Sequence, residues 1–380
     1  MSYITTASEE KLAIVVDIGS GSVGIGIVHL VPNTTPEIVW THREYTTIKE
    51  TSLQPATKII KTALLNSFLE LDAKGTQFIP NHLTSEDIID THVYIHAPWV
   101  YTVIKSVTYS QEHSFTITDE LIDELTSAAE VNTKETLADL PELASLVVLN
   151  ATPQAIIANG YRISNWHNLK ARTLKLSLNT TLTHQALADM IYEMHEKTIP
   201  NTQITVRSHT AAVHDCLQTL HPEMQENCIV TITTEATEIG IVRNGVLQYV
   251  TSMPTGTYTL AREIASKANV PTEESYSSLK HSYNKIQKDK NINAAVESYK
   301  VQLTKLFLQT GDALHIPKSI YVHCEGSIHE LFLRITSEAA TASTEITHSV
   351  HYLTNDILGG SHEQDTSFLV AVQQAATRAN

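Results

Sequence analysis

The feature that most constrains the fold of this chain is an internal repeat of two three-stranded segments. Residues 11–30 contain an Ile- and Val-rich run, a glycine-rich turn and a second apolar run, and EIVWTHREYTT adds a third run. Residues 228–251 repeat this order about 215 residues later, with Asn244–Gly245 at the second turn. An Asn-Gly dipeptide between apolar runs is typical of a β-hairpin. The repeat therefore predicts two similar α/β halves.

A separate unit is expected between the two repeats. Residues 105–110 alternate as a strand, and Thr118 precedes a helical segment with carboxylates in its first turn. Residues 145–158 and 172–178 read as two further strands, so the order is strand–helix–strand–strand. The next helix is expected to take Thr183 as its N-cap.

Charge and cysteine content exclude several classes of function. The chain has 380 residues and a formal net charge of 26 − 41 = −15, which argues against nucleic acid or an anionic membrane as the main partner. Cys216, Cys228 and Cys324 form no C-x-x-C motif, so neither a disulfide framework nor a zinc cluster is indicated. The start is polar and acidic, and no apolar run reaches the ~18 residues of a membrane span. We expect a soluble cytoplasmic protein without direct membrane insertion.

Several motifs, taken in order, resemble the actin-like ATPase superfamily. VVDIGSGSVGIGIV resembles its first phosphate loop, while VTITTEATEIGIVRNGVL and SIYVHCEGSIHELF lie where its second phosphate loop and its adenosine loop belong. The inserted unit, including TPQAIIANG, is similar to the SHS2-type subdomain inserted in the division protein FtsA and in its pilus-assembly relative PilM. SMPTGTYTLAREIASKANVPTEESYSSLK and TSFLVAVQQAA continue the match, so the resemblance covers nearly the whole chain.

The resemblance implies an α/β fold of duplicated actin-like (ribonuclease H-like) domains with an inserted strand–helix–strand–strand subdomain. Residues 1–100, 171–225 and 361–380 are expected to form the first actin-like domain. Residues 226–360 are expected to form the second, and residues 101–170 the inserted SHS2-like subdomain.

The first loop retains the residue types that the resemblance requires for nucleotide. In such folds an aspartate at the end of the first strand orients water and Mg²⁺, and glycines let backbone N–H groups approach phosphates. Asp17 is the candidate for Mg²⁺, and Gly19, Ser20, Gly21 and Ser22 are the candidate phosphate cradle. An ordinary glycine-rich turn beside an aspartate is the alternative.

The second loop departs from the family pattern of glycines flanked by carboxylates. Thr233, Thr234 and Glu235 stand where glycines belong, and Thr231 replaces the first carboxylate. Thr233 and Thr234 remain the candidate phosphate contacts, whereas Glu235 is expected to direct a carboxylate toward the phosphates. Two unit charges ~4 Å apart repel by about 4 kcal/mol at an effective dielectric near 20.

The adenosine side is altered as well. Three glycines are expected after the strand, and the chain has Cys324, Glu325 and Gly326. Lys280 matches the ribose-contacting lysine, but Ser277 stands where the partner glutamate belongs. If ATP and Mg²⁺ bind, we therefore expect weak binding through Asp17, the two loops, Lys280 and Gly326.

A histidine pair gives no further site. His209 and His214 are five residues apart, which is a poor spacing for one helical face, so no metal site is indicated.

The function that the resemblance implies is a cytoplasmic adaptor of the FtsA and PilM kind with weak or lost nucleotide hydrolysis. Such a protein would be recruited to the inner face of the membrane by division or type IV pilus proteins that contact residues 101–170. Self-association is left open. The alternatives are an active, polymerising ATPase and, less well matched, a sugar kinase.

Overall fold

The computed structural model describes most of the chain, and every structural statement below refers to the described part. The described residues are 10–32, 34–46, 53–138, 145–200, 202–286, 290–310, 315–324, 328–360 and 365–379.

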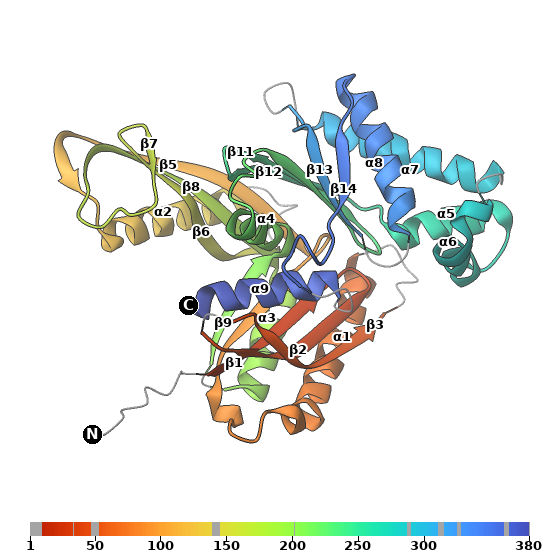
Figure 1. The fold of residues 1–380 in the computed structure, drawn as a ribbon, viewed down its shortest axis with the longest axis horizontal. Helices are drawn as coiled ribbons and strands as arrows, with labels where there is room; N and C mark the ends of the chain where they lie inside the picture. Colours follow the sequence, from red (N-terminus) through yellow and green to blue (C-terminus); the bar gives the residue numbers. More distant parts are fainter. Residues whose placement is uncertain are drawn as a thin grey trace.

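Two five-stranded sheets with the same topology form the framework, as the internal repeat predicts (Figure 1). The first has the order β3-β2-β1-β4-β9, and the second has the order β12-β11-β10-β13-β14. In each, three antiparallel strands are extended by two parallel ones. The strands are β1 (Lys11–Ile18), β2 (Ser22–Leu30), β3 (Glu37–Tyr45), β4 (Ile88–Ile95), β9 (Gln203–Ser208), β10 (Asn227–Ile232), β11 (Thr237–Arg243), β12 (Val246–Met253), β13 (Ser319–Cys324) and β14 (Ser349–Tyr352).

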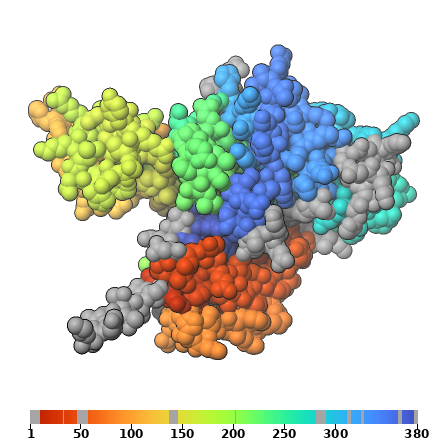
Figure 2. Space-filling model, viewed as in Figure 1, coloured from red at the N-terminus to blue at the C-terminus, as the bar shows by residue number. Residues whose placement is uncertain are grey.

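The unit between the repeats is a four-stranded sheet with the order β5-β8-β6-β7 and one helix, α2, packed on it. Its elements are β5 (Val100–Thr116), α2 (Asp119–Ala138), β6 (Leu146–Ala158), β7 (Tyr161–Ile163) and β8 (Lys170–His184). Figure 2 shows it as a lobe that projects from the rest of the molecule. Because β8 pairs with β5 and β6 along its length, the sheet extends past the boundary expected at residue 170.

Helices cover the two five-stranded sheets on both faces. The helices α1 and α3 share a core with one face of the first sheet, and α5, α7 and α8 share one with the second. The bounds are α1 (Leu53–Ala73), η1 (Gly75–Phe78), η2 (Ser85–Asp87), α3 (Gln185–Thr198), α4 (His209–Leu220), α5 (Thr257–Ala268), α6 (Thr272–Ile286), α7 (Lys290–Leu308), α8 (His329–Thr344) and α9 (Thr366–Ala379).

One core joins the two halves. Ala13 and Val15 of β1 and Ile229 of β10 belong to the same buried cluster, together with apolar side chains of α4 and α9. Figure 1 shows α9 lying between the two sheets. The two sheets therefore share these helices, which fixes how the hairpin turns of β1–β2 and β10–β11 face each other.

Local signals are confirmed at one turn and wrong at one helix start. Asn244 and Gly245 have φ values of 51° and 66° between β11 and β12, as an Asn-Gly hairpin requires. By contrast, α3 begins after His184, and no side chain caps it. Thr183 lies in β8, and its hydroxyl donates to the carbonyl of Trp99 at 2.5 Å. Thr183 therefore pairs in the sheet, with Val100 and Val147, and cannot act as the N-cap that the sequence predicts.

None of the helices in the described part of the chain is long and apolar enough to cross a membrane.

Candidate functional site

The two turns that the sequence singles out as phosphate loops are in contact. The hydroxyl of Ser20 donates to Thr233 Oγ1 at 2.7 Å and accepts from the backbone N–H of Glu235 at 2.8 Å. The side chain of Thr234 lies so close to Gly21 that a Cβ on this glycine would come within 2.5 Å of Thr234 Oγ1. The structure therefore brings the predicted loop residues together, but as packing partners of each other.

The turn also uses part of its own hydrogen-bonding capacity. The N–H of Gly19 donates to the carbonyl of Ser22 at 2.9 Å, and the carbonyl of Gly19 accepts from Trp99 Nε1 at 3.0 Å. A phosphate cradle needs backbone N–H groups that face outward. The N–H of Gly19 is instead bonded across the hairpin to Ser22.

Asp17 lies in a row of three residues that runs across the sheet. It is opposite Gly24 on β2, and Gly24 is opposite Arg43 on β3. Arg43 Nη2 reaches across to Asp17 Oδ2 at 2.8 Å, and a Cβ on Gly24 would lie 2.8 Å from that nitrogen. Glycine at position 24 is therefore what leaves room for the ion pair.

The other oxygen of Asp17 is also bonded. His96, directly after β4, places Nε2 2.7 Å from Asp17 Oδ1. Asp17 is fully buried, and burial alone would raise its pKa, but the charges of His96 and Arg43 outweigh burial and hold the pKa well below its usual range. Both oxygens of the residue predicted to bind Mg²⁺ are thus engaged by cationic or hydrogen-bonding side chains of the chain itself.

Arg43 connects this carboxylate to two further elements. Its Nη1 donates to Ser22 Oγ at 2.9 Å, and its Nε lies 3.0 Å from Asp365 Oδ2. Asp365 caps the start of α9, since its Oδ1 accepts from the N–H of Ser367 at 3.0 Å. One guanidinium therefore links β1, β2 and the helix that lies between the two sheets.

Three histidines from distant parts of the chain stack beside Asp17. The rings of His96 and His209 are 3.8 Å apart, and those of His209 and His323 are 5.3 Å apart, with interplanar angles of 21° and 28°. All three are buried. Burial lowers the pKa of His209 well below its ordinary value and that of His323 to about 3, so these two rings are neutral near neutral pH.

Of these three histidines, only His209 was singled out by its spacing in the sequence. His96 and His209 each follow the carboxyl end of a parallel strand, β4 and β9, and His323 lies one residue before the end of β13. Carboxyl ends of parallel strands meet at one edge of a sheet, which is where α/β folds place their sites. This position, and not the five-residue spacing to His214, is the sequence signal that identifies the stack.

The expectation for Glu235 is wrong. Its carboxylate accepts from Arg262 Nη1 at 2.8 Å, from a second nitrogen of the same guanidinium and from Thr259 Oγ1 at 3.1 Å. Arg262 and Thr259 lie on α5, which follows the second meander. The charge of Glu235 is therefore compensated within its own half of the molecule and is not directed at the first loop.

The remaining predicted residues lie on α6 and β13 or outside the described part. Lys280 on α6 holds its Nζ 4.3 Å from the centre of the Tyr276 ring. Cys324 is buried at the end of β13. Glu325 and Gly326 are outside the described residues.

A second buried carboxyl lies in the other half, on the strand next to the position that corresponds to Asp17. Glu238 on β11 is opposite Thr231 and accepts a hydrogen bond from the hydroxyl of Thr210, at the start of α4. Burial raises the pKa of Glu238 to about 7, although the bond from Thr210 acts in the other direction. Glu238 therefore titrates within the physiological range.

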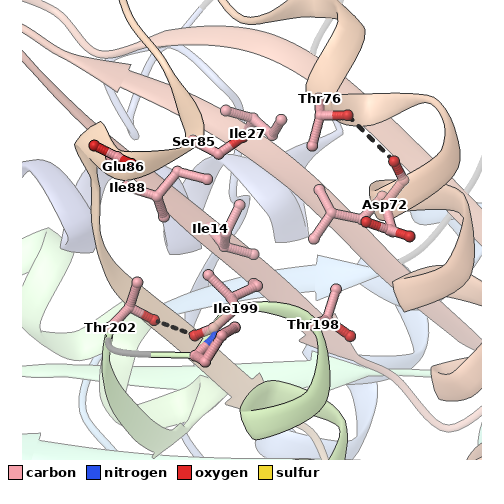
Figure 3. Close-up of a pocket in the computed structure, with 12 residues that line it drawn as sticks. Ile14, Ile27, Asp72, Thr76, Ser85, Glu86, Ile88, Thr198, Ile199 and Thr202 are labelled. Carbon is pink, nitrogen blue, oxygen red and sulfur yellow. Dashed lines mark hydrogen bonds between the residues drawn. The ribbon is translucent and has the colours of Figure 1, made fainter.

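A separate cavity of about 510 Å³ lies beneath the first sheet, between α1 and α3 (Figure 3). Its polar side chains are two carboxylates and several hydroxyls, and no basic side chain lines it. The lining residues are Ile14, Ile27, Leu71, Asp72, Thr76, Ser85, Glu86, Ile88, Thr198, Ile199, Pro200 and Thr202.

Removing the arginine tests the energetic importance of the Asp17 network. We expect Arg43→Met to lower the free energy of unfolding by about 3–5 kcal/mol, because it leaves a buried carboxylate with one partner fewer. Asp17→Asn together with Arg43→Met should recover part of this loss, as measured by urea unfolding. Lys197→Met, which breaks an exposed pair with Glu193, is the control and should cost about 0–1 kcal/mol. If Arg43→Met and Lys197→Met lower the free energy of unfolding by the same amount, Arg43 does not stabilise the buried Asp17 carboxylate.

Glu238 predicts a pH dependence with a definite sign. A carboxyl whose folded pKa is about 7, above its ordinary 4.5, holds its proton more tightly when folded, so it lowers stability as pH rises through this interval. Relative to wild type, Glu238→Gln should gain on the order of 3 kcal/mol between about pH 5 and pH 8. Urea unfolding at several pH values measures the difference, with the exposed Glu193→Gln as control. If the difference in free energy of unfolding between Glu238→Gln and wild type does not change with pH, burial does not raise the pKa of Glu238.

Comparison with known proteins supports the fold. No protein-family model and no curated protein matches the chain. Among solved structures, the chain is similar to a PilM chain in a PilM–PilN type IV pilus biogenesis complex, with 13% identity, 98% of this chain and 99% of that chain covered, and a TM-score of 0.59.

Two further structures match less well. The ethanolamine utilization protein EutJ from Carboxydothermus hydrogenoformans has 10% identity, with 96% and 89% of the two chains covered and a TM-score of 0.46. A nucleotide-free diol dehydratase-reactivating factor has 8% identity, coverage of 97% and 99%, and a TM-score of 0.49. The duplicated sheets and the match to the PilM chain establish that the chain has an actin-like ATPase fold of the PilM kind, as its sequence motifs predicted.

Proposed function

We propose that this chain is an actin-fold scaffold that holds protein partners at the inner face of the membrane, in pilus assembly or cell division, without depending on ATP hydrolysis. The observation that carries the proposal is the state of Asp17. The carboxylate that relatives offer to metal and water is buried here between Arg43 and His96.

The residues present do not fit Mg²⁺ and a triphosphate. A cation at Asp17 would have to compete with the guanidinium of Arg43, which is 2.8 Å away. Phosphate oxygens between the two turns would have to displace the contact of Ser20 with Thr233 and that of Gly21 with Thr234. A metal cation bound to Asp17 and the guanidinium of Arg43 would repel each other by several kcal/mol at the effective dielectric of a protein. We therefore assign no chemical step to ATP in this chain.

The partner side of the proposal rests on the inserted sheet and on the similar structure, which is a complex of PilM with a pilus protein. Tyr161 at the tip of β6–β7 is 78% exposed and Val131 on α2 is 53% exposed. Exposed aromatic and apolar side chains of this kind are what partner proteins bury in interfaces. We place the contact with a membrane-associated partner on this lobe.

Ligand-dependent stability separates the scaffold from the alternative, an ATP-binding polymerising ATPase. A ligand at a hundred times its dissociation constant stabilises the folded state by about 2.7 kcal/mol, whereas one present near its dissociation constant adds only about 0.4 kcal/mol. We expect millimolar Mg·ATP to give the smaller effect in a thermal-shift titration, with hydrolysis at background. A large shift, with low-micromolar binding by calorimetry, would refute the scaffold proposal in favour of the ATPase.

Crosslinking in the source cell tests the partner contact. A photo-reactive amino acid in place of Tyr161 should give a crosslinked species in the membrane fraction, because we place the partner on this lobe. The same replacement of Phe78, which is 57% exposed at the end of η1 and lies outside the lobe, is the control and should give none. If crosslinks to membrane proteins form only from position 78, or from neither position, the lobe is not the contact surface.

A further inference from the structure

Three side chains of types that can bind metals converge at the end of the β1–β2 hairpin that lies away from its turn. Glu10 directly precedes β1, His29 is the penultimate residue of β2, and His82 lies in the turn between η1 and η2. The Nε2 atoms of His29 and His82 are 3.0 Å and 2.7 Å from the same carboxylate oxygen, Oε2 of Glu10.

The two imidazole rings approach that oxygen from different directions. Their planes are inclined at 67°, with centroids 6.2 Å apart, so the two Nε2 atoms meet at the carboxylate while the rings diverge. The ligand atoms of the three residues all lie within 4.8 Å of one another. Ligand atoms around a tetrahedral zinc ion, at about 2.0–2.1 Å from the metal, are roughly 3.3 Å apart. The two separations between histidine nitrogen and carboxylate oxygen, 2.7 and 3.0 Å, need an expansion of only a few tenths of an ångström.

Exposure of the three side chains leaves the cluster accessible. His82 is 63% exposed and Glu10 is 32% exposed, whereas His29 is 11% exposed and anchored in the sheet. A glutamate carboxylate is ionised at neutral pH. Two imidazoles and one carboxylate form the ligand set of open zinc sites, in which water takes the fourth position.

The other cluster of such groups is less suited to a metal. Asp17, His96 and His209 also lie within 4.8 Å of one another, and all three are buried. However, His96 and His209 are stacked face to face, so the in-plane lone pairs of their nitrogens run side by side and do not converge on one point. The Asp17 carboxylate is also already paired with Arg43.

We propose that Glu10, His29 and His82 bind a zinc ion, with Glu10 supplying an oxygen and each histidine its Nε2. Metal binding would fix the turn that carries His82 to the ends of β1 and β2. That turn leads directly into Ser85 and Glu86, which line the cavity beneath the sheet (Figure 3). The site thus holds one wall of the cavity in place, and it is independent of the scaffold function proposed above.

Calorimetry with zinc chloride on chelator-treated, full-length protein tests the site. We expect wild type to bind one zinc ion, and His82→Ala and Glu10→Gln each to weaken binding about tenfold or more, which corresponds to about 1.4 kcal/mol. His167→Ala is the matched control, because His167 is an equally exposed histidine that faces a single carboxylate, Asp119, at 3.3 Å. This variant should bind zinc as wild type does.

Cobalt(II) gives a second readout that does not depend on affinity alone. Tetrahedral Co²⁺ bound by nitrogen and oxygen ligands absorbs in the visible range, so wild type should develop this band and Glu10→Gln should not. Circular dichroism establishes that the variants are folded, which the exposure of His82 and Glu10 leads us to expect. The proposal is overturned if wild type binds no zinc, or if His82→Ala and Glu10→Gln bind it as tightly as wild type.

Discussion

The ion pair between Asp17 and Arg43 is the interaction on which the arrangement of the two halves depends. A buried carboxylate is costly unless it is paired and hydrogen-bonded, and here Arg43 and His96 each take one oxygen. The pair exists because the three central strands of the first sheet place Asp17, Gly24 and Arg43 in one row, with a glycine in the middle. Since Arg43 also reaches the cap of α9, the same charge that neutralises Asp17 fixes the helix between the sheets.

The histidine stack extends this network from one half of the molecule to the other. His96 directly follows β4 of the first sheet, His209 begins α4 and His323 lies in β13 of the second sheet, so the stacked rings connect the two halves. The three buried rings fill the space between the ends of β4 and β13 and the start of α4. Together with the direct contact of Ser20 with Thr233, they make the space between the two turns part of the packed interior.

Much of the architecture could be predicted from the sequence because its signals are local. The two meanders and the Asn-Gly hairpin depend on periodicity and turn residues that are adjacent in the chain, and both are confirmed. The inserted unit has the expected helix and strands, but it also has a short strand, β7, in the stretch that the sequence indicates as a turn. The start of α3 was misplaced because Thr183 belongs to β8, whose extent depends on pairing with β5 and β6. The short strand β14 was not expected, since four residues carry too little pattern to be recognised.

In the candidate site, too, the features set by local sequence can be predicted, whereas those set by tertiary packing cannot. The sequence by itself determined which residues stand at the two turns, and that Asp17 faces Gly24, because a hairpin sets the register of its own strands. It could not determine that Arg43 would reach Asp17 or that Arg262 would neutralise Glu235, since these side chains come from separate elements whose register and docking depend on the whole fold. Only the tertiary structure brings His96, His209 and His323 together, because contacting residues more than 100 positions apart in sequence meet through the packing of two sheets on shared helices.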